Sequence, residues 1–295
     1  EILLASQNID QNTTSMLAYT AIPVDMQEYS NWLNEYIDIL DLKSNLQKFL
    51  FGKTFSKEIL IDSSIKTEMM GSKKLVKREI LIEFLEDIAN LLKERRLDQY
   101  ARFNIYSIYV RYVLSILLGT RDFSISVDLS RISWKKNVII IKEKGKYKNA
   151  GYRAIPLCTL SHDIIKNYLS ILNRLGIADR SIVLYHKGVY LSSTLVNIKK
   201  VFKAFDFYNR NHELYERIDL IPLNVGRHII TTMATAAGIN RDDMNAFMGH
   251  AINGGELLGI YSFHNIKEYS AKFEVILNEI SEIYQLKDIY TNVKL

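Results

Sequence analysis

Apolar residues recur at helical spacing in several parts of the 295-residue chain. Steps of three and four residues predict helices within residues 26–40, 81–92, 106–117, 161–176, 192–205 and 266–286. Such steps place the apolar side chains on one face of a helix, which can then pack on a core. Gly119 and Gly176 follow two of these stripes, and glycine commonly ends a helix. The pattern therefore predicts a mainly helical protein.

A different pattern, typical of strands, occupies the middle of the chain. Residues 138–141 form an unbroken β-branched run, and residues 152–157 form a second extended stretch. Between them lies a lysine-rich turn that contains Gly145 and ends at Gly151. Residues 182–185 predict one more short strand. We therefore expect the α+β class, mainly helical, with a small antiparallel sheet or hairpin.

The polar stretches suggest two domains. Residues 1–26 are largely polar and lack a clear period, and residues 71–74 (Gly-Ser-Lys-Lys) are typical of a linker. We predict an N-terminal arm and helical segment over residues 1–74, and a larger domain over residues 75–295. Residues 207–221 are expected to form a connection. Because the chain begins with glutamate instead of methionine, we expect part of the N-terminal domain to lie upstream of this sequence.

Composition narrows the class of protein further. With 48% hydrophobic and 24% charged residues, the chain has the composition of a globular protein. Its net charge of +5 is compatible with a polyanionic partner and with an ordinary, slightly basic protein. The single cysteine, Cys158, excludes an internal disulfide framework and a thiolate metal cage. No apolar run approaches the roughly 20 residues that span a bilayer, so we expect a cytoplasmic protein without membrane contact.

The residues that suggest chemistry lie mainly near the C-terminus. Here the sequence reads Asn224-x-x-Arg227-His228, then Gly249-His250, then Tyr261-x-x-His264. Gly238 and Gly249 are expected to end helices and Asn240 to begin one. Such a fold could bring Arg227, His250 and Tyr261 together. Upstream, Gly119-Thr120-Arg121 ends a buried helix, and residues 143–151 carry Lys144, Lys146 and Lys148.

Taken together, these motifs resemble the signature of the tyrosine recombinase (phage integrase) family over about residues 75–295. The family has histidine where this chain has Asn224, and this chain has about two more residues between His250 and Tyr261. The resemblance implies a recombinase-like catalytic domain that cuts and rejoins DNA through a 3′-phosphotyrosine. It also implies that residues 1–74 are a remnant of, or a linker to, a helical core-binding domain.

Each site residue has a role that the resemblance implies. Tyr261 is the expected nucleophile, because a phenol can hold the DNA end covalently while keeping the bond energy for rejoining. Arg121 and Arg227 are expected to bind the non-bridging phosphate oxygens with fixed, always-charged donors. The leaving 5′-oxygen must be protonated, and Lys144 is the expected general acid, with Lys146 and Lys148 as alternatives.

The remaining positions have supporting roles. His250 is expected to donate a hydrogen bond to a phosphate oxygen, and Asn224 to position the phosphate, because an amide cannot titrate as a histidine does. His228 is expected to be buried and structural. Tyr269 is a rival nucleophile, although its place on the last helical stripe favours a core position. No metal or cofactor is expected, because the histidines and acidic residues here lack ligand spacing.

The expected partner is double-stranded DNA. Lysines that could contact its phosphates are Lys146 and Lys148 of the turn and Lys199, Lys200 and Lys203 of a helix, although a solvated helix face explains the last three equally well. In the family, a C-terminal helix docks into a neighbouring protomer, which implies a dimer or tetramer on DNA. The helix at residues 266–286 could equally pack on its own domain.

These features predict an integrase or transposase of a mobile element, acting on DNA of the nucleoid. Two other functions stay open. A type IB topoisomerase has similar residues but relaxes supercoils as a monomer. A DNA-binding protein could also have kept the fold and lost the chemistry, which Asn224 makes plausible.

Overall fold

The chain divides into two compact units, Glu1–Lys73 and Lys74–Leu295. The computed structural model describes residues 21–24, 68–71, 76–94, 97–120, 127–142, 152–204, 212–221, 224–249 and 265–292. In the first unit these include strands β1 (Ala21–Val24) and β2 (Glu68–Gly71), which pair antiparallel. The sequence analysis placed residues 21–24 in an N-terminal arm and predicted no strand in either segment. The two strands were missed because two four-residue strands far apart in the chain carry little local pattern.

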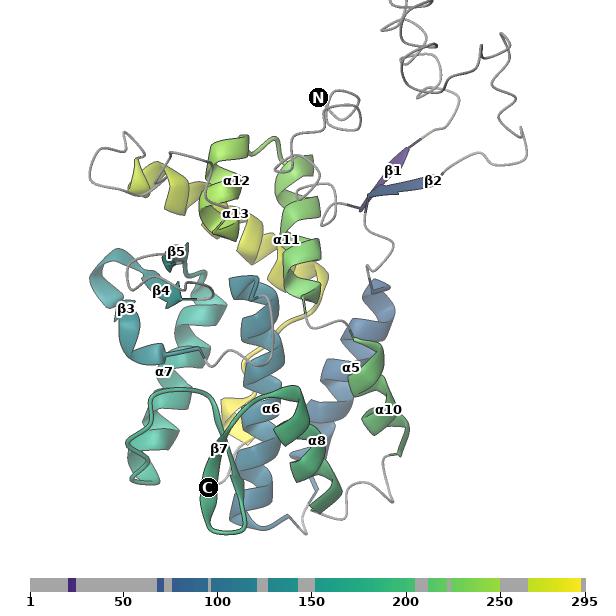
Figure 1. The fold of residues 1–295 in the computed structure, drawn as a ribbon, viewed down its shortest axis with the longest axis vertical. Helices are drawn as coiled ribbons and strands as arrows, with labels where there is room; N and C mark the ends of the chain where they lie inside the picture. Colours follow the sequence, from purple (N-terminus) through teal and green to yellow (C-terminus); the bar gives the residue numbers. More distant parts are fainter. Residues whose placement is uncertain are drawn as a thin grey trace, which may run out of the picture. The chain divides into compact units, whose positions relative to one another are not determined.

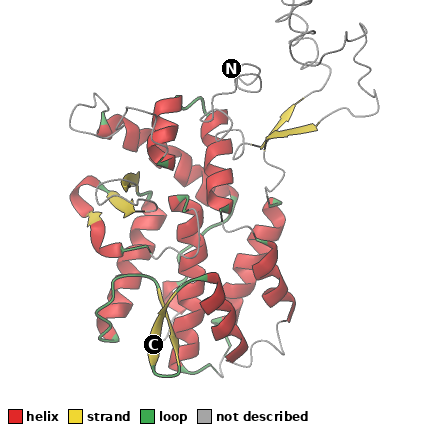
Figure 2. Ribbon diagram, viewed as in Figure 1, coloured by secondary structure: helices red, strands yellow, loops and turns green. Residues whose placement is uncertain are grey.

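The second unit is mainly helical, with small antiparallel sheets, as expected for its class (Figures 1 and 2). Its helices are α5 (Arg78–Leu91), α6 (Gln99–Leu118), α7 (Thr159–Arg174), α8 (Leu195–Ala204), α10 (His212–Leu220), α11 (Val225–Ala236), α12 (Arg241–Met248) and α13 (Ile266–Ile283). The strands are β3 (Ile132–Ser133), β4 (Val138–Lys142), β5 (Tyr152–Pro156), β6 (Val183–His186) and β7 (Val189–Ser192). Short 3-10 helices are η1 (Leu129–Arg131), η2 (Trp134–Lys136) and η3 (Tyr290–Asn292).

Helix α6 forms the centre of this unit. Its side chains are buried on every face from Phe103 to Leu118, whereas an amphipathic surface helix buries only one stripe. Helices α5, α7, α11 and α13 and strand β6 all pack against it. Asp98 begins the helix by accepting a hydrogen bond from the Ala101 backbone N–H at 2.7 Å. At the other end, Gly119 adopts a left-handed conformation with φ +54° and ends it.

The larger sheet has the strand order β3-β4-β5, and the predicted hairpin of β4 and β5 is confirmed. Ile139 pairs with Ile155, and Lys142 pairs with Tyr152. Alternation along the strands directs Ile139, Ile141 and Ile155 into the core. Helices α12 and α13 pack on β5, so the sheet is held against the C-terminal helices.

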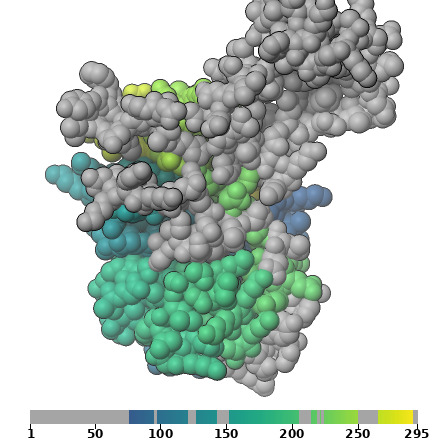
Figure 3. All heavy atoms as spheres, in the orientation of Figure 1, coloured from purple at the N-terminus to yellow at the C-terminus, as the bar shows by residue number. Residues whose placement is uncertain are grey.

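A second hairpin, β6 and β7, packs on α6 at its N-terminal half. Asn104 fixes it by donating to the Tyr185 carbonyl at 2.8 Å and accepting from the Tyr185 backbone N–H at 2.6 Å. Together with α7 and α8, this hairpin forms the teal-green part of the surface in the space-filling view (Figure 3). Only the strand near β6 was expected. Its partner β7 follows a two-residue turn at Lys187 and Gly188, both with positive φ, a geometry that suits hairpins.

Helix α10 is a further correction, because its residues were predicted to be part of a connection. Its apolar residues Leu214 and Ile218, followed by Ile221, are buried. Arg217 of α10 also forms an ion pair with Asp87 of α5, with 2.9 Å between Nη1 and Oδ2. The helical stripe is short and most other residues are polar, so packing on α5 decides this helix more than its own pattern does.

Candidate functional site

Two buried arginines meet at the C-terminal end of α6. The Gly119 carbonyl accepts hydrogen bonds from Nη2 of Arg153, at 2.9 Å, and from Nη1 of Arg227, at 3.1 Å. Arg153 comes from β5 and Arg227 from α11, and both residues are buried. A helix C-terminus carries a partial negative charge and carbonyls that lack partners within the helix, so it favours cations. The end of α6 is therefore a place where the fold retains two positive charges.

The same guanidinium groups also bind the end of α12. Arg153 donates through Nη1 to the Phe247 carbonyl at 2.6 Å, and Arg227 donates through Nη2 to the Met248 carbonyl at 2.7 Å. Gly249 ends α12 with φ +65°, and a Cβ there would lie 3.1 Å from Cδ of Arg153. Each planar guanidinium thus joins two helix ends. We call Gly119, Arg153, Arg227 and the end of α12 at Phe247 and Met248 the arginine cluster.

Local features of the sequence place both arginines. In α11, Gly226 lies against the backbone of α6, where an added Cβ would overlap the Ser115 carbonyl oxygen and lie 2.6 Å from Cα of Ile116. This close approach brings the next residue, Arg227, to the end of α6. In β5, Arg153 has the same alternation as Ile155 and points to the buried face.

Among the predicted site residues, Arg227 lies in the arginine cluster. Arg121, Lys144, Lys146, Lys148, His250 and Tyr261 lie outside the described residues. Two of them, Arg121 and His250, directly follow a described residue, and these two described residues lie at or next to the cluster. Thr120, which precedes Arg121, is buried and follows Gly119. Gly249, which precedes His250, lies against Arg153, because a Cβ at Gly249 would be 3.1 Å from Cδ of Arg153. Tyr152, which follows the lysine-rich segment, is adjacent to Arg153.

Asn224 stands directly before α11 and is half-buried. Its backbone carbonyl accepts a hydrogen bond from the Arg227 N–H at 2.9 Å, but its side chain makes no capping bond to the helix. Asparagine at this position usually caps the helix through its side-chain oxygen. The amide of Asn224 is therefore not used for helix capping, which agrees with its expected role at a phosphate.

Arg153 is the residue that the sequence analysis missed. One signal could have found it. Its alternation with Ile155 in a strand predicts an inward-pointing arginine, and a charged side chain is seldom buried without a specific partner.

The predicted DNA-contacting lysines of α8 lie away from the arginine cluster. Lys199 and Lys203 place their Nζ atoms 5.9 and 5.4 Å from the ring centre of Tyr215. Burial lowers the pKa of His186 in β6, and the nearby positive charge of Lys200 lowers it further. Helix α8 contacts β6, near the N-terminal half of α6, whereas the cluster is at the C-terminal end (Figure 1). The structure therefore does not bring these lysines together with Arg227.

Tyr269, the rival nucleophile, is a core residue. Only 1% of its surface is exposed, and its hydroxyl donates to the Ala154 carbonyl at 2.9 Å. Burial raises the pKa of Tyr269 far above its ordinary value, so its phenolate is strongly disfavoured. His228 is also buried, as the sequence analysis expected.

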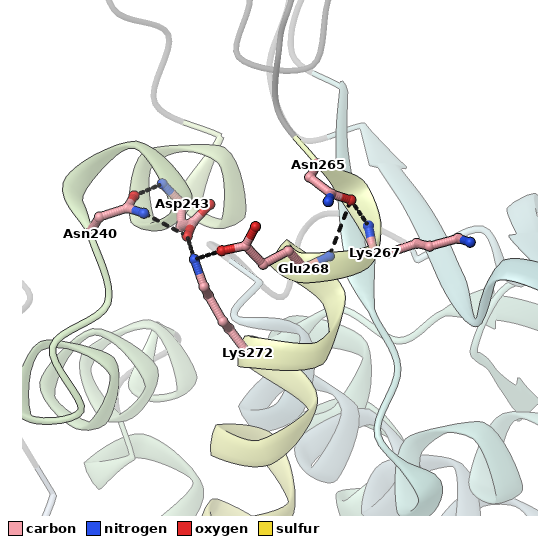
Figure 4. Close-up of polar contacts among 6 residues, drawn as sticks. All are labelled: Asn240, Asp243, Asn265, Lys267, Glu268 and Lys272. Carbon is pink, nitrogen blue, oxygen red and sulfur yellow. Dashed lines mark hydrogen bonds and ion pairs between the residues drawn. The ribbon is translucent and has the colours of Figure 1, made fainter.

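A polar bridge joins α12 and α13 on either side of residues 250–264 (Figure 4). Nζ of Lys272 lies 3.1 Å from Oδ2 of the buried Asp243 and 2.8 Å from Oε1 of Glu268. Asn240 and Asn265 begin the two helices, and each accepts backbone hydrogen bonds through its side-chain oxygen. The ion pairs therefore join the two helices that flank residues 250–264 in the sequence.

Helix α13 packs within its own unit. Its apolar face, with Tyr269, Phe273, Ile276, Leu277 and Ile280, is buried against α11, β5, α6 and α7. Because the apolar face of α13 is buried within its own unit, it is not available to a second protomer. The prediction that this helix joins protomers therefore has no supporting surface. Of the two arrangements left open by the sequence, α13 takes the internal one. A homo-oligomer stays a prediction without an assigned surface.

In the described ranges, no three histidine, cysteine, aspartate or glutamate side chains are grouped so that they could hold a metal ion. None of the helices in those ranges is both long enough and apolar enough to cross a bilayer. Comparison with known proteins found no matching family model, no matching curated protein and no matching solved structure.

Proposed function

We propose that this protein cuts and rejoins DNA strands through a tyrosine–phosphate ester, as a tyrosine recombinase of the integrase or transposase type. Double-stranded DNA is the proposed partner, and no metal ion takes part in the proposed chemistry. The observation that carries the proposal is the arginine cluster. Arg227 is part of this cluster. Thr120 and Gly249, the residues that precede Arg121 and His250, lie at or next to it.

Covalent geometry adds weight to this observation. Consecutive Cα atoms lie about 3.8 Å apart, so a residue cannot be far from its chain neighbour. Arg121 and His250 each follow a described residue at the cluster, and the sequence separations between them and Arg227 are large. Residues with unrelated roles need not have their chain neighbours at the same place in the fold. The convergence supports a joint role for Arg121, Arg227 and His250.

The proposed reaction is a balanced exchange of phosphate esters. The oxygen of Tyr261 attacks a DNA phosphorus, the bond to the 5′-oxygen breaks, and a 3′-phosphotyrosine forms. The phenol gives its proton to water, and Lys144 gives one to the departing 5′-oxygen. Arg121 and Arg227 stabilise the extra charge on the non-bridging oxygens, because guanidinium donors are fixed and always charged. Attack by a 5′-hydroxyl reverses the steps and rejoins a strand.

A nicked suicide duplex tests the chemistry. We expect a covalent protein–DNA adduct on a denaturing gel, lost in Tyr261→Phe and mapped to Tyr261 by mass spectrometry of the digested adduct. Tyr100→Phe is the matched control, because Tyr100 is exposed and lies at the N-terminal end of α6. An adduct that survives in Tyr261→Phe would contradict the assignment of the nucleophile. Relaxation of supercoiled plasmid without a preferred site would indicate a topoisomerase.

Asn224 makes a second test possible. A histidine there could accept the proton of the nucleophile, and the amide cannot. We therefore expect Asn224→His to cleave the suicide substrate faster than the wild-type protein, at equal DNA occupancy. No gain, or a loss, would contradict the idea that the lack of a titratable group at this position slows cleavage.

One observation favours a second function, a DNA-binding protein without chemistry. Both terminal nitrogens of Arg227 donate to backbone carbonyls, so this arginine also holds the fold together. A protein that binds duplex DNA, keeps its fold and forms no adduct under any tested substrate geometry would fit this function. The suicide-substrate assay, run beside a binding assay, separates the two.

A further inference from the structure

The outer face of the sheet carries a cluster that the proposed catalytic residues do not include. Along β4, Ile139 and Ile141 point into the core, whereas Ile140 and Lys142 are exposed. Lys142 pairs with Tyr152 across the hairpin, and 42% of Tyr152 is exposed. The outward face of this small sheet therefore presents a lysine and a tyrosine side by side.

A third side chain joins them from η1. The Cζ atom of Arg131 lies 5.4 Å from the centre of the Tyr152 ring, and Nζ of Lys142 lies 5.1 Å from the same centre. Both distances are within the range of cation–π attraction. We call Arg131, Lys142 and Tyr152 the sheet-face cluster. Two like charges that would otherwise repel are thus held beside one aromatic ring.

The cluster has more positive charge than its neighbours among the described residues balance. Nε of Arg131 lies 3.0 Å from Oδ2 of Asp128, and this carboxylate also accepts from Ser130 N–H and Oγ–H. Asp128 thus balances one of the two cations. A hydrogen bond from Arg131 and the nearby charge of Lys142 lower the pKa of Tyr152, although desolvation opposes the shift. The lowered pKa reports a positive potential at the phenol oxygen.

We propose that the sheet-face cluster binds one backbone phosphate of DNA, a contact separate from the phosphate that is cut. Arg131 offers forked guanidinium donors, Lys142 an ammonium and Tyr152 a hydroxyl, and all three are donors that phosphate oxygens accept. The inference rests on the proposed function, because it takes DNA as the partner.

Tyr152 is the chain neighbour of a residue in the arginine cluster. Tyr152 and Arg153 are consecutive in β5, so their side chains point to opposite faces of the sheet. Arg153 reaches the Gly119 carbonyl on the inner face, while Tyr152 is on the outer one. One strand therefore carries one residue of each cluster, which keeps the proposed phosphate contact apart from the arginine cluster.

The test compares two double variants in duplex binding as a function of salt concentration. Arg131→Gln/Lys142→Gln removes both cations of the sheet-face cluster. Lys93→Gln/Lys287→Gln removes the same charge near α5, which lies across α6 from the sheet in Figure 1. Both control lysines are exposed and have a polar or acidic neighbour, as Arg131 has Asp128.

We expect the first double variant to bind about tenfold more weakly and to lower the slope of log affinity against log salt by about one, the value for one lost phosphate contact. The control is expected to keep the wild-type slope. Tyr152→Phe keeps the ring and loses the hydroxyl, and we expect it to weaken binding by about two- to tenfold. Lys142→Gln alone provides the measurement if the double variant unfolds.

Equal slopes for the two double variants would overturn the inference. Wild-type protein that binds no duplex would overturn it together with the proposed function. Wild-type protein that binds DNA and forms no adduct, while the slope still falls in the Arg131→Gln/Lys142→Gln variant, would leave the phosphate contact standing and remove only the chemistry. The adduct assay and the salt slope thus report the two proposals separately.

Discussion

Two asparagines begin consecutive helices, and they use their side chains differently. Asn240 accepts the Asp243 backbone N–H at 2.7 Å through its side-chain oxygen and caps α12. Asn224 precedes α11 with φ −107° and ψ 20° and makes no such bond. The extended backbone of Asn240, with ψ 158°, is the conformation that capping requires. The same residue type is therefore structural at one position and available for another role at the other.

We expect Asn240→Ala to lower the free energy of unfolding by about 1 kcal/mol, and Asn224→Ala to lower it by less than about 0.5 kcal/mol. Urea unfolding of both variants measures the difference. Equal losses would show that Asn224 has a structural role, and would weaken its assignment to the phosphate.

Arg153 gives a second prediction at this scale. Its guanidinium satisfies the carbonyls of Phe247 and Gly119, and both bonds are buried. We expect Arg153→Met to lower the free energy of unfolding by about 2–4 kcal/mol, because two buried, charge-assisted hydrogen bonds are lost. The Phe247 carbonyl loses this donor, whereas the Gly119 carbonyl keeps Arg227. Arg153→Lys should restore little, since an ammonium lacks the planar fork. Arg174→Met, at an exposed position in the last turn of α7, is the control and should change stability by less than about 0.5 kcal/mol.

Among the elements, the contact between α11 and α6 decides where Arg227 lies. Gly226 lets the two backbones approach so closely that a Cβ would lie 2.6 Å from Cα of Ile116 and 2.7 Å from its carbonyl oxygen. Neither backbone can move aside cheaply, because α6 is buried on every face. A helix shifted outward would also draw Arg227 away from the Gly119 and Met248 carbonyls.

We therefore expect Gly226→Ala to lower the free energy of unfolding by at least about 2 kcal/mol, although alanine favours helices by about 1 kcal/mol over glycine. Gly176→Ala is the matched control. Gly176 has φ +68° and open space around the Cβ position, so alanine there should cost about 1 kcal/mol through backbone strain alone. Thermal unfolding of the two variants measures both effects. A stabilised Gly226→Ala variant would contradict the close approach of α11 and α6.

At the scale of the whole unit Lys74–Leu295, buried tyrosines make stability depend on high pH. Tyr106, Tyr109, Tyr168 and Tyr269 are each at most 2% exposed. Burial is the largest cause that raises the pKa of all four phenols. In the unfolded chain these phenols titrate near pH 10. Their contribution is therefore fully present below about pH 10 and is lost as the pH rises above that value.

We expect the free energy of unfolding to fall from about pH 10 upward, by about 1.4 kcal/mol per pH unit for each tyrosine that ionises only in the unfolded chain. Urea unfolding at several pH values gives the slope, and phenolate absorbance should appear together with unfolding. Tyr269→Phe should lower the slope by the share of one tyrosine. Phenolate absorbance from these tyrosines before unfolding would contradict their burial.

The sequence by itself determined the elements whose signals are local. Apolar spacing predicted α5, α6, α7 and α13, and the β-branched run with its turn predicted the hairpin of β4 and β5. Gly119 and Gly249 end α6 and α12 as expected, because the left-handed conformation there suits glycine. These features depend on a few neighbouring residues, which the sequence displays directly.

Only the tertiary structure decided which distant groups meet. The Gly119 carbonyl binds both Arg153 and Arg227 because three elements from different parts of the chain end at one point. The same holds for α10, which packs on α5, and for the internal packing of α13. Such contacts depend on the packing of the entire unit, and no short window of sequence contains the partners. The sequence therefore shows the residue types of the arginine cluster, whereas only the fold brings Arg153 and Arg227 to the same end of α6.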